Sequence, residues 1–120
     1  TTESSNVPRR VIFDIGYMLS SENELNIPDV FALHDNYPNP FNPVTTIRYD
    51  VPEQSNVRVD IYNVLGQKVA ELVNTTHQPG FYAVSWDGTN MVGSALGSGM
   101  YFYRIDAEKF TAVKKLLLVK

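Results

Sequence analysis

The sequence predicts an all-β protein, an immunoglobulin-like antiparallel β-sandwich of about seven strands. From residue 31 onward, stretches of alternating apolar and polar residues are separated by turn residues at intervals of roughly eight to twelve positions. No stretch has the apolar spacing of a convincing helix. The chain has 120 residues, 43% of them hydrophobic, which suffices for one hydrophobic core but hardly for two.

Turn residues separate the expected strands. Pro52 ends one strand because proline cannot donate to a β-ladder, and Gly66 can adopt the positive φ that a bulged hairpin needs. Residues 78–80 and the pair Asp87-Gly88 supply further turns. Residues 88–99 are glycine-rich and are expected to form a surface loop. We expect strands over residues 31–33, 47–51, 57–62, 67–73, 81–86, 100–107 and 110–119.

The first thirty residues are expected to lie outside the sandwich. The chain starts without an initiating Met or an apolar leader, so we expect it to be a piece of a longer protein. Val11 to Leu19 is a short apolar run, either the tail of a preceding domain or an extra edge strand. Residues 20–30 are polar and acidic and contain a proline, which is typical of a linker. The expected division is therefore 1–19, 20–30 and 31–120.

Composition argues against several classes of function. The formal net charge of the chain is -3. A nucleic-acid-binding protein usually has a basic surface that binds phosphates, so we expect no nucleic acid as a partner. Without cysteine the chain has no disulfide, no thiolate metal site and no cysteine nucleophile. The longest aliphatic run is Leu116 to Val119, too short for membrane insertion as a spanning helix.

Candidate catalytic groups are scarce. His34 and His77 are the only histidines, and we interpret both as solvated loop residues beside polar turns. Asp87 could begin a calcium loop, but no later carboxylate completes it, so we expect it to cap backbone amides of a turn. We therefore expect no enzyme activity, no metal and no cofactor.

The late aromatic residues allow two interpretations. Trp86, Tyr101, Phe102 and Tyr103 could line a sugar-binding face or fill the core. Alternation sends Tyr101 and Tyr103 to one face and Phe102 to the other, and core packing is the default interpretation. In a sugar-binding module, Trp86→Ala should abolish retention on polysaccharide without unfolding the domain.

Residues 36–43, Asn-Tyr-Pro-Asn-Pro-Phe-Asn-Pro, form what we call the proline segment. Its three prolines restrict φ and favour extended conformations at the residues before them, which predicts a stiff approach to the next strand. Asn39 and Asn42 are expected to cap turns. Tyr37 and Phe41 are expected to pin the segment onto the sandwich.

Several later blocks accompany the proline segment: Thr45 to Ile47, Val59 to Gln67, Gly80 to Tyr82, Trp86 to Gly88, Ser98 to Arg104 and Lys114 to Lys120. In this order they resemble the type A C-terminal sorting domain of the type IX (Por) secretion system, over about residues 31–120. The resemblance implies a seven-stranded immunoglobulin-like sandwich, related to the corresponding domain of the flagellar hook-capping protein. It also implies a position at the C-terminus of a secreted cargo protein.

The function implied by this resemblance is a noncatalytic address. Such a domain crosses the periplasm folded, is recognised by the type IX translocon, and is removed by a sortase, so that its cargo reaches the outer-membrane surface or the medium. Residues 1–19 would then be the tail of the N-terminal cargo domain. The family determinants that match here are Pro38, Asn39, Pro40, Gly80, Tyr82, Gly99, Tyr101, Lys114, Lys115 and Leu116.

Two alternatives stay open at the level of sequence, one for the function and one for the last strand. The competing function is a carbohydrate-binding or structural Ig-like spacer module of an extracellular enzyme. The last strand is either a basic, apolar strip that adds to a partner's sheet edge or a buried strand with lysines at its rim. Cleavage by a sortase is expected within residues 20–30, and the activity of the cargo does not follow from a signal domain.

Overall fold

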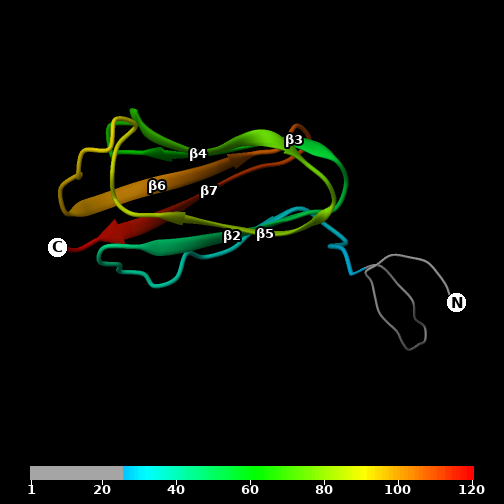
Figure 1. The fold of residues 1–120 in the computed structure, drawn as a ribbon, viewed down its shortest axis with the longest axis horizontal. Helices are drawn as coiled ribbons and strands as arrows, with labels where there is room; N and C mark the ends of the chain where they lie inside the picture. Colours follow the sequence, from blue (N-terminus) through cyan, green and yellow to red (C-terminus); the bar gives the residue numbers. More distant parts are fainter. Residues whose placement is uncertain (1–25) are drawn as a thin grey trace, which may run out of the picture.

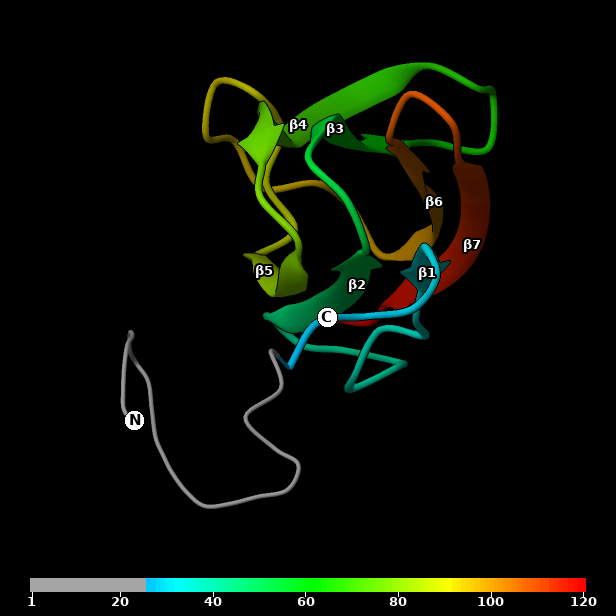
Figure 2. The same cartoon turned by 90° about the vertical axis from the view of Figure 1, so that its right-hand side faces the viewer.

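The computed structural model describes residues 26–120, which fold into two β-sheets packed face to face (Figures 1 and 2). One sheet has the strand order β1-β2-β5 and the other the order β4-β3-β6-β7, and all pairs are antiparallel. The strands are β1 (Ala32–Leu33), β2 (Thr45–Val51), β3 (Ser55–Tyr62), β4 (Lys68–His77), β5 (Gly80–Trp86), β6 (Gly99–Asp106) and β7 (Thr111–Leu118). The predicted seven-stranded sandwich is confirmed. The apolar run expected over residues 11–19 lies outside the described residues.

Tight turns join the hairpin strands where the sequence predicts them. Gly66 has a φ of 82° between β3 and β4, and Glu108 has a φ of 61° between β6 and β7. β4 continues past the predicted end at residue 73 to His77. It does so because Ser55, at the start of β3, pairs with His77 and prolongs the ladder.

The inward side chains of β2, β3 and β6 are almost fully buried and form the core, as alternation predicts. Trp86 belongs to this core: it is 2% exposed, and its ring centroid lies 5.6 Å from Phe41 and 5.5 Å from Tyr101. Tyr103 is buried as well, whereas Phe102 faces the outside of its sheet. The core interpretation is therefore correct. The buried Trp86 is not an exposed sugar-binding ring, and Trp86→Ala would empty part of the core, so this substitution does not test the sugar-binding alternative.

The strands give the sandwich two distinct ends. β2 begins where β5 ends, since Thr45 pairs with Trp86, and the start of β6 pairs with the end of β7. The chain terminus lies here, at what we call the C-terminal end (Figure 1). At the opposite end Val51 pairs with Gly80, and residues 26–31 lead into β1. We call this the linker end.

Candidate recognition surface

The first half of the proline segment is anchored to the start of β2. Tyr37 and Thr46 exchange backbone hydrogen bonds of 3.0 and 2.9 Å. Asn36 is buried, and its side-chain amide donates to the Thr45 hydroxyl, which donates to the Pro38 carbonyl at 2.8 Å. The Tyr37 side chain is 72% exposed, so the prediction that its ring pins the segment is wrong. The buried Asn36 holds the segment instead.

The second half of the segment is anchored to β7. The Phe41 ring is 1% exposed and packs in the core, as predicted. The Phe41 N–H donates to the Leu117 carbonyl and the Phe41 carbonyl accepts from the Val119 N–H, both at 3.0 Å. The side-chain oxygen of Asn39 accepts from the Leu117 N–H, also at 3.0 Å. The Asn39 side chain therefore provides a hydrogen-bond acceptor for a backbone N–H at the edge of β7. It does not cap a turn, contrary to the prediction.

The basic and apolar residues near the end of β7 separate by alternation. Leu116 and Leu118 are each 1% exposed, while Lys115 is exposed on the outer face. The Lys114 ammonium lies at the sheet edge, 3.0 Å from the Asp35 carboxylate. Because that carboxylate is 87% exposed, solvent screens the pair and its contribution to stability is at most about 1 kcal/mol. The buried-strand interpretation is thus correct for these two leucines.

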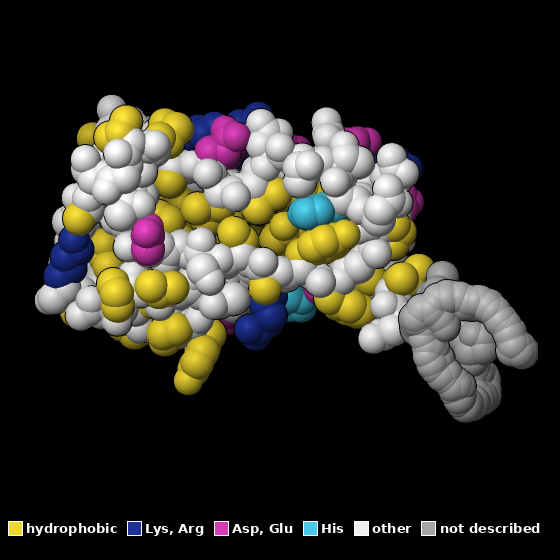
Figure 3. All heavy atoms as spheres, viewed as in Figure 1, with side chains coloured by type: hydrophobic (Ala, Val, Ile, Leu, Met, Phe, Trp, Pro, Cys, Tyr) yellow, Lys and Arg dark blue, Asp and Glu magenta, His cyan; other side chains and the backbone are white. Residues whose placement is uncertain are grey.

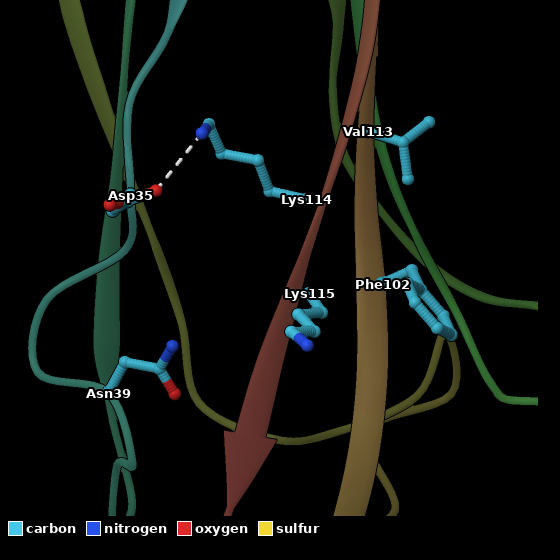
Figure 4. A pocket seen from close by; sticks show the side chains of 6 residues that line it. All are labelled: Asp35, Asn39, Phe102, Val113, Lys114 and Lys115. Atoms are coloured by element: carbon cyan, nitrogen blue, oxygen red, sulfur yellow. Dashed lines mark ion pairs between the residues drawn. The ribbon is translucent and has the colours of Figure 1, made fainter.

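A shallow, open depression of about 480 Å³ lies where the proline segment meets β7 (Figure 4). Lys114 points toward Asp35 across its rim, whereas Lys115 and Phe102 lie next to each other because they are partners in the β6–β7 ladder. An open depression with charged sides suits an extended peptide or protein surface better than an enclosed small molecule. Its lining residues are Asp35, Asn39, Phe102, Val113, Lys114 and Lys115.

Two Gly-x-Tyr sequences form the same local structure. The Tyr82 hydroxyl donates to the Gln78 carbonyl at 2.6 Å, and the Tyr101 hydroxyl donates to the Gly97 carbonyl at 2.7 Å. In both, the tyrosine hydroxyl reaches back past the glycine to the carbonyl four residues earlier. Each hydrogen bond ties the start of a strand to the loop that precedes it.

The glycines of these sequences serve the same structure in different ways. A Cβ on Gly80 would lie 3.3 Å from the Tyr82 ring, so a larger residue would displace the tyrosine. Gly99 has open space around it but a φ of 154°, which L side chains rarely adopt. The structure therefore provides a folding reason for both Gly-x-Tyr pairs.

Tyr82 also belongs to an aromatic stack at the linker end. Its ring lies on that of His77 with centroids 3.8 Å apart, and the Tyr49 hydroxyl shares a hydrogen bond of 2.8 Å with His77 Nε2. Burial raises the pKa of Tyr49 to about 12 and lowers the pKa of His77, because the charged form of each loses hydration. His77 is part of β4, so its interpretation as a loop histidine is wrong.

The predicted recognition residues fall into separate groups. Those of the proline segment and of β7 meet at the C-terminal end, and Gly99 lies beside them because it pairs with Leu118. Gly80 and Tyr82 lie at the linker end, separated from this group by the length of β5, about 20 Å. The group that meets at the C-terminal end comprises Pro38, Asn39, Pro40, Gly99, Tyr101, Lys114, Lys115 and Leu116.

Asp35 and Val113 line the depression although no motif includes them, and Phe102 lines it although it is not among the predicted recognition residues. Phe102 and Val113 come to it through the register of the β6–β7 hairpin. Asp35 comes to it because the continuation of β1, which is still bonded to β2, lies beside β7. Period-two alternation places Phe102 on the outer face, which is the one signal that could have indicated it.

Catalytic and metal-binding arrangements are not found in residues 26–120. No three His, Cys, Asp or Glu side chains in that range gather closely enough to hold a metal ion. His34 has a half-exposed side chain, and its Nε2 lies 3.0 Å from the Asp50 carboxylate. Asp87 accepts hydrogen bonds from the N–H and the hydroxyl of Thr89, at 3.2 and 2.6 Å. The predicted turn-capping role of Asp87 is confirmed.

Comparison with known families accounts for the proline segment, the Gly-x-Tyr sequences and β7 together. All of them fall within residues 35–120, which match the family model described as "Secretion system C-terminal sorting domain". The chain belongs to this family. The resemblance inferred from the sequence is therefore confirmed, and the chain is a C-terminal sorting domain of type IX secretion. Domains of this family are in general noncatalytic.

Two solved structures from Porphyromonas gingivalis each contain a part that is similar in fold to this chain. Dimeric latent PorU aligns with a TM-score of 0.62 and 27% identity, over 77% of this chain and 9% of PorU. PorZ, described as an essential bacterial surface component of the type-IX secretion system, aligns with a TM-score of 0.50 and 19% identity, over 77% of this chain and 12% of PorZ. The second similarity shows the fold alone. No curated protein sequence matches the chain.

A type IX sorting domain implies export of the protein to the cell surface or the medium. Within the part of the chain that the structure describes, no helix is long and apolar enough to cross a membrane.

Proposed function

We propose that the type IX translocon recognises this sorting domain at the C-terminal end of the sandwich. The surface it reads would combine the exposed part of the proline segment with the two lysines of β7 and the depression between them. The observation that carries this proposal is the set of three hydrogen bonds joining Asn39 and Phe41 to Leu117 and Val119. They make one rigid surface from two segments that lie far apart in the sequence.

Rigidity supports a recognition role. A receptor that reads one signal on many cargos gains affinity when the signal needs no ordering on binding, and the prolines and these hydrogen bonds provide that preorganisation. Lys114 and Lys115 outnumber Asp35 in the lining of the depression, so the surface keeps a net positive charge, which speeds the encounter with a partner of opposite charge. We therefore expect an acidic surface on the translocon component that binds here.

The family determinants then divide into two roles. We propose direct contacts with the translocon for Pro38, Asn39, Pro40, Lys114 and Lys115, all of which lie at the C-terminal end. We propose a scaffolding role for the remaining determinants, since the leucine is buried, the two tyrosines tie loops to strands, and the two glycines leave room or adopt a backbone conformation that other residues disfavour. These are Gly80, Tyr82, Gly99, Tyr101 and Leu116.

We further propose that a sortase separates the domain from an N-terminal cargo domain by cleavage within residues 20–30, after export through the periplasm. Residues 26–30 form no strand, and the Ile27 and Val30 side chains are 41% and 65% exposed, so a protease could reach this backbone. Pro28 is buried against the sandwich, which favours a cut before it. Intact-mass analysis of exported cargo tests this, and a mature C-terminus beyond Leu33 would contradict it.

A fusion of the 120-residue chain to an unrelated periplasmic protein tests the address function. We expect cells with a type IX system to export the fusion, and deletion from Thr111 onward to stop export. Retention of the intact fusion in the periplasm would contradict the address function.

Single substitutions test the proposed surface separately. Lys115→Ala should reduce export severalfold without lowering the thermal midpoint, because the side chain is exposed. Lys109→Ala is the matched control: this lysine is 75% exposed, pairs with Glu53 and lies in the β6–β7 turn at the linker end. Equal export by both variants would reject the surface while leaving the address function intact.

A further inference from the structure

β5 is the least protected edge strand of the described sandwich. The sheet edges are formed by β1, β5, β4 and β7. β1 has two residues, β4 carries Lys68 and Glu71, and β7 carries two lysines and bonds to the proline segment. Short length, charge and cover are the usual means by which an edge avoids pairing with another chain. β5, with the sequence Gly-Phe-Tyr-Ala-Val-Ser-Trp, has none of them.

The unpaired side of β5 borders an apolar strip. The backbone of residues 81–85 bonds only to β2 among the described residues. Leu72 and Val73 of β4 and Tyr82 and Val84 of β5 are only partly buried where they pack against the core. Figure 3 shows apolar side chains gathered along the gap between these two strands. A strand added to β5 would satisfy its backbone groups and cover this strip.

We propose that Val11 to Leu19 of the same chain is that strand and pairs antiparallel with β5. The segment reads Val-Ile-Phe-Asp-Ile-Gly-Tyr-Met-Leu, so every residue at positions 11, 13, 15, 17 and 19 is apolar. A strand with one fully apolar face is suited to an edge position where that face covers a core. Its nine residues are enough to pair with all seven residues of β5.

The path of the described chain is consistent with this pairing. Figure 2 shows residues 26–31 starting on the β5 side, passing below β2 and reaching β1. Residues 20–27 can span about 25 Å when extended, whereas adjacent strands lie only about 4.8 Å apart. A chain that runs along β5 toward the linker end and then passes below β2 is antiparallel to β5, because β5 begins at that end.

A tethered segment has an advantage over any second molecule. A short flexible connection gives it an effective concentration in the millimolar range, whereas a second copy must bind from dilute solution. Pairing in cis would also cover this edge, so that copies of the uncleaved protein do not associate through β5.

Amide exchange measured by NMR on the 120-residue chain tests the proposal. The informative amides are those of residues 11–19 and those of residues 81–85 that point away from β2. In the unaltered chain we expect both sets to exchange at least tenfold more slowly than in Ile15→Pro, because proline removes a donor and breaks the pairing. Ser5→Pro, outside the segment, is the matched control and should resemble the unaltered chain. Unchanged exchange in β3 and β6 would show that every variant is folded.

Two results would overturn the proposal. Residues 11–19 that exchange as fast as an unstructured peptide would show that the segment does not bind β5, and would favour its role as the tail of a cargo domain. Slow exchange in residues 81–85 that persists in Ile15→Pro would show that another occupant covers the edge. Sedimentation velocity at two protein concentrations would then identify a second copy by a concentration-dependent dimer.

Discussion

Replacing Phe41 with alanine tests whether the proline segment is part of the folded core. The Phe41 ring is 1% exposed and packs against Trp86. Truncation of a buried phenylalanine to alanine costs about 3 to 5 kcal/mol. A single domain of this size has a free energy of unfolding of about 5 to 15 kcal/mol, so the loss would be a large part of the total. We expect a strongly lowered urea midpoint with an unchanged m-value.

Two further variants separate the core contact from the hydrogen bonds. Asn39→Ala removes one partly exposed hydrogen bond to the Leu117 N–H and should cost about 0.5 to 1.5 kcal/mol. Phe41→Leu keeps an apolar side chain in the same place and should fall between the two. If Phe41→Ala cost no more than Asn39→Ala, the segment would contribute only surface hydrogen bonds, and the assignment of Phe41 to the core would be refuted.

Four other substitutions test the structure. Gly66→Ala should lower the free energy of unfolding by about 1 to 2 kcal/mol, since φ is 82°, whereas Gly97→Ala, with open space and no positive φ, should be neutral in the same thermal unfolding assay. Tyr101→Phe should lose about 0.5 to 1.5 kcal/mol, because the Gly97 carbonyl loses its donor, and urea unfolding would measure this. Burial lowers the pKa of His77, which lies beside Tyr49 and Tyr82, so the unfolded chain binds a proton at this histidine more readily than the folded chain does. The free energy of unfolding should therefore fall as the pH drops below 6.5, and His77→Phe should weaken this dependence in urea titrations between about pH 7.5 and 5.5.

Most strands follow from local pattern, and the exceptions have a common cause. Alternation locates β2 and β3, and Gly66 marks the hairpin that follows them. The end of β4 is missed because residues 74–77, Asn-Thr-Thr-His, carry no apolar alternation. These residues form a strand because their backbone pairs with the start of β3, which lies about twenty residues earlier in the chain.

The recognition surface is only partly evident from the sequence. The proline segment and the terminal lysines are recognisable as motifs, yet their contact is not. Asn39 and Leu117 are separated by 78 positions, and their hydrogen bond exists because the segment crosses the end of β7. The motif also does not show that Asn36 is buried and Tyr37 exposed. Burial of these two side chains depends on which of them faces Thr45, and in the structure that is Asn36.

The amino-acid sequence was enough to assign the all-β class, the family and the general function of a sorting domain. Those properties depend on alternation, on turn residues and on short motifs, each of which can be recognised within a few neighbouring positions. Only the tertiary structure decided that Gly80 and Tyr82 lie away from the C-terminal end, that Asn39 bonds to β7, and that no strand within residues 26–120 pairs with the outer edge of β5. Strand order and register depend on packing between distant parts of the chain, and the same local pattern is compatible with many such arrangements.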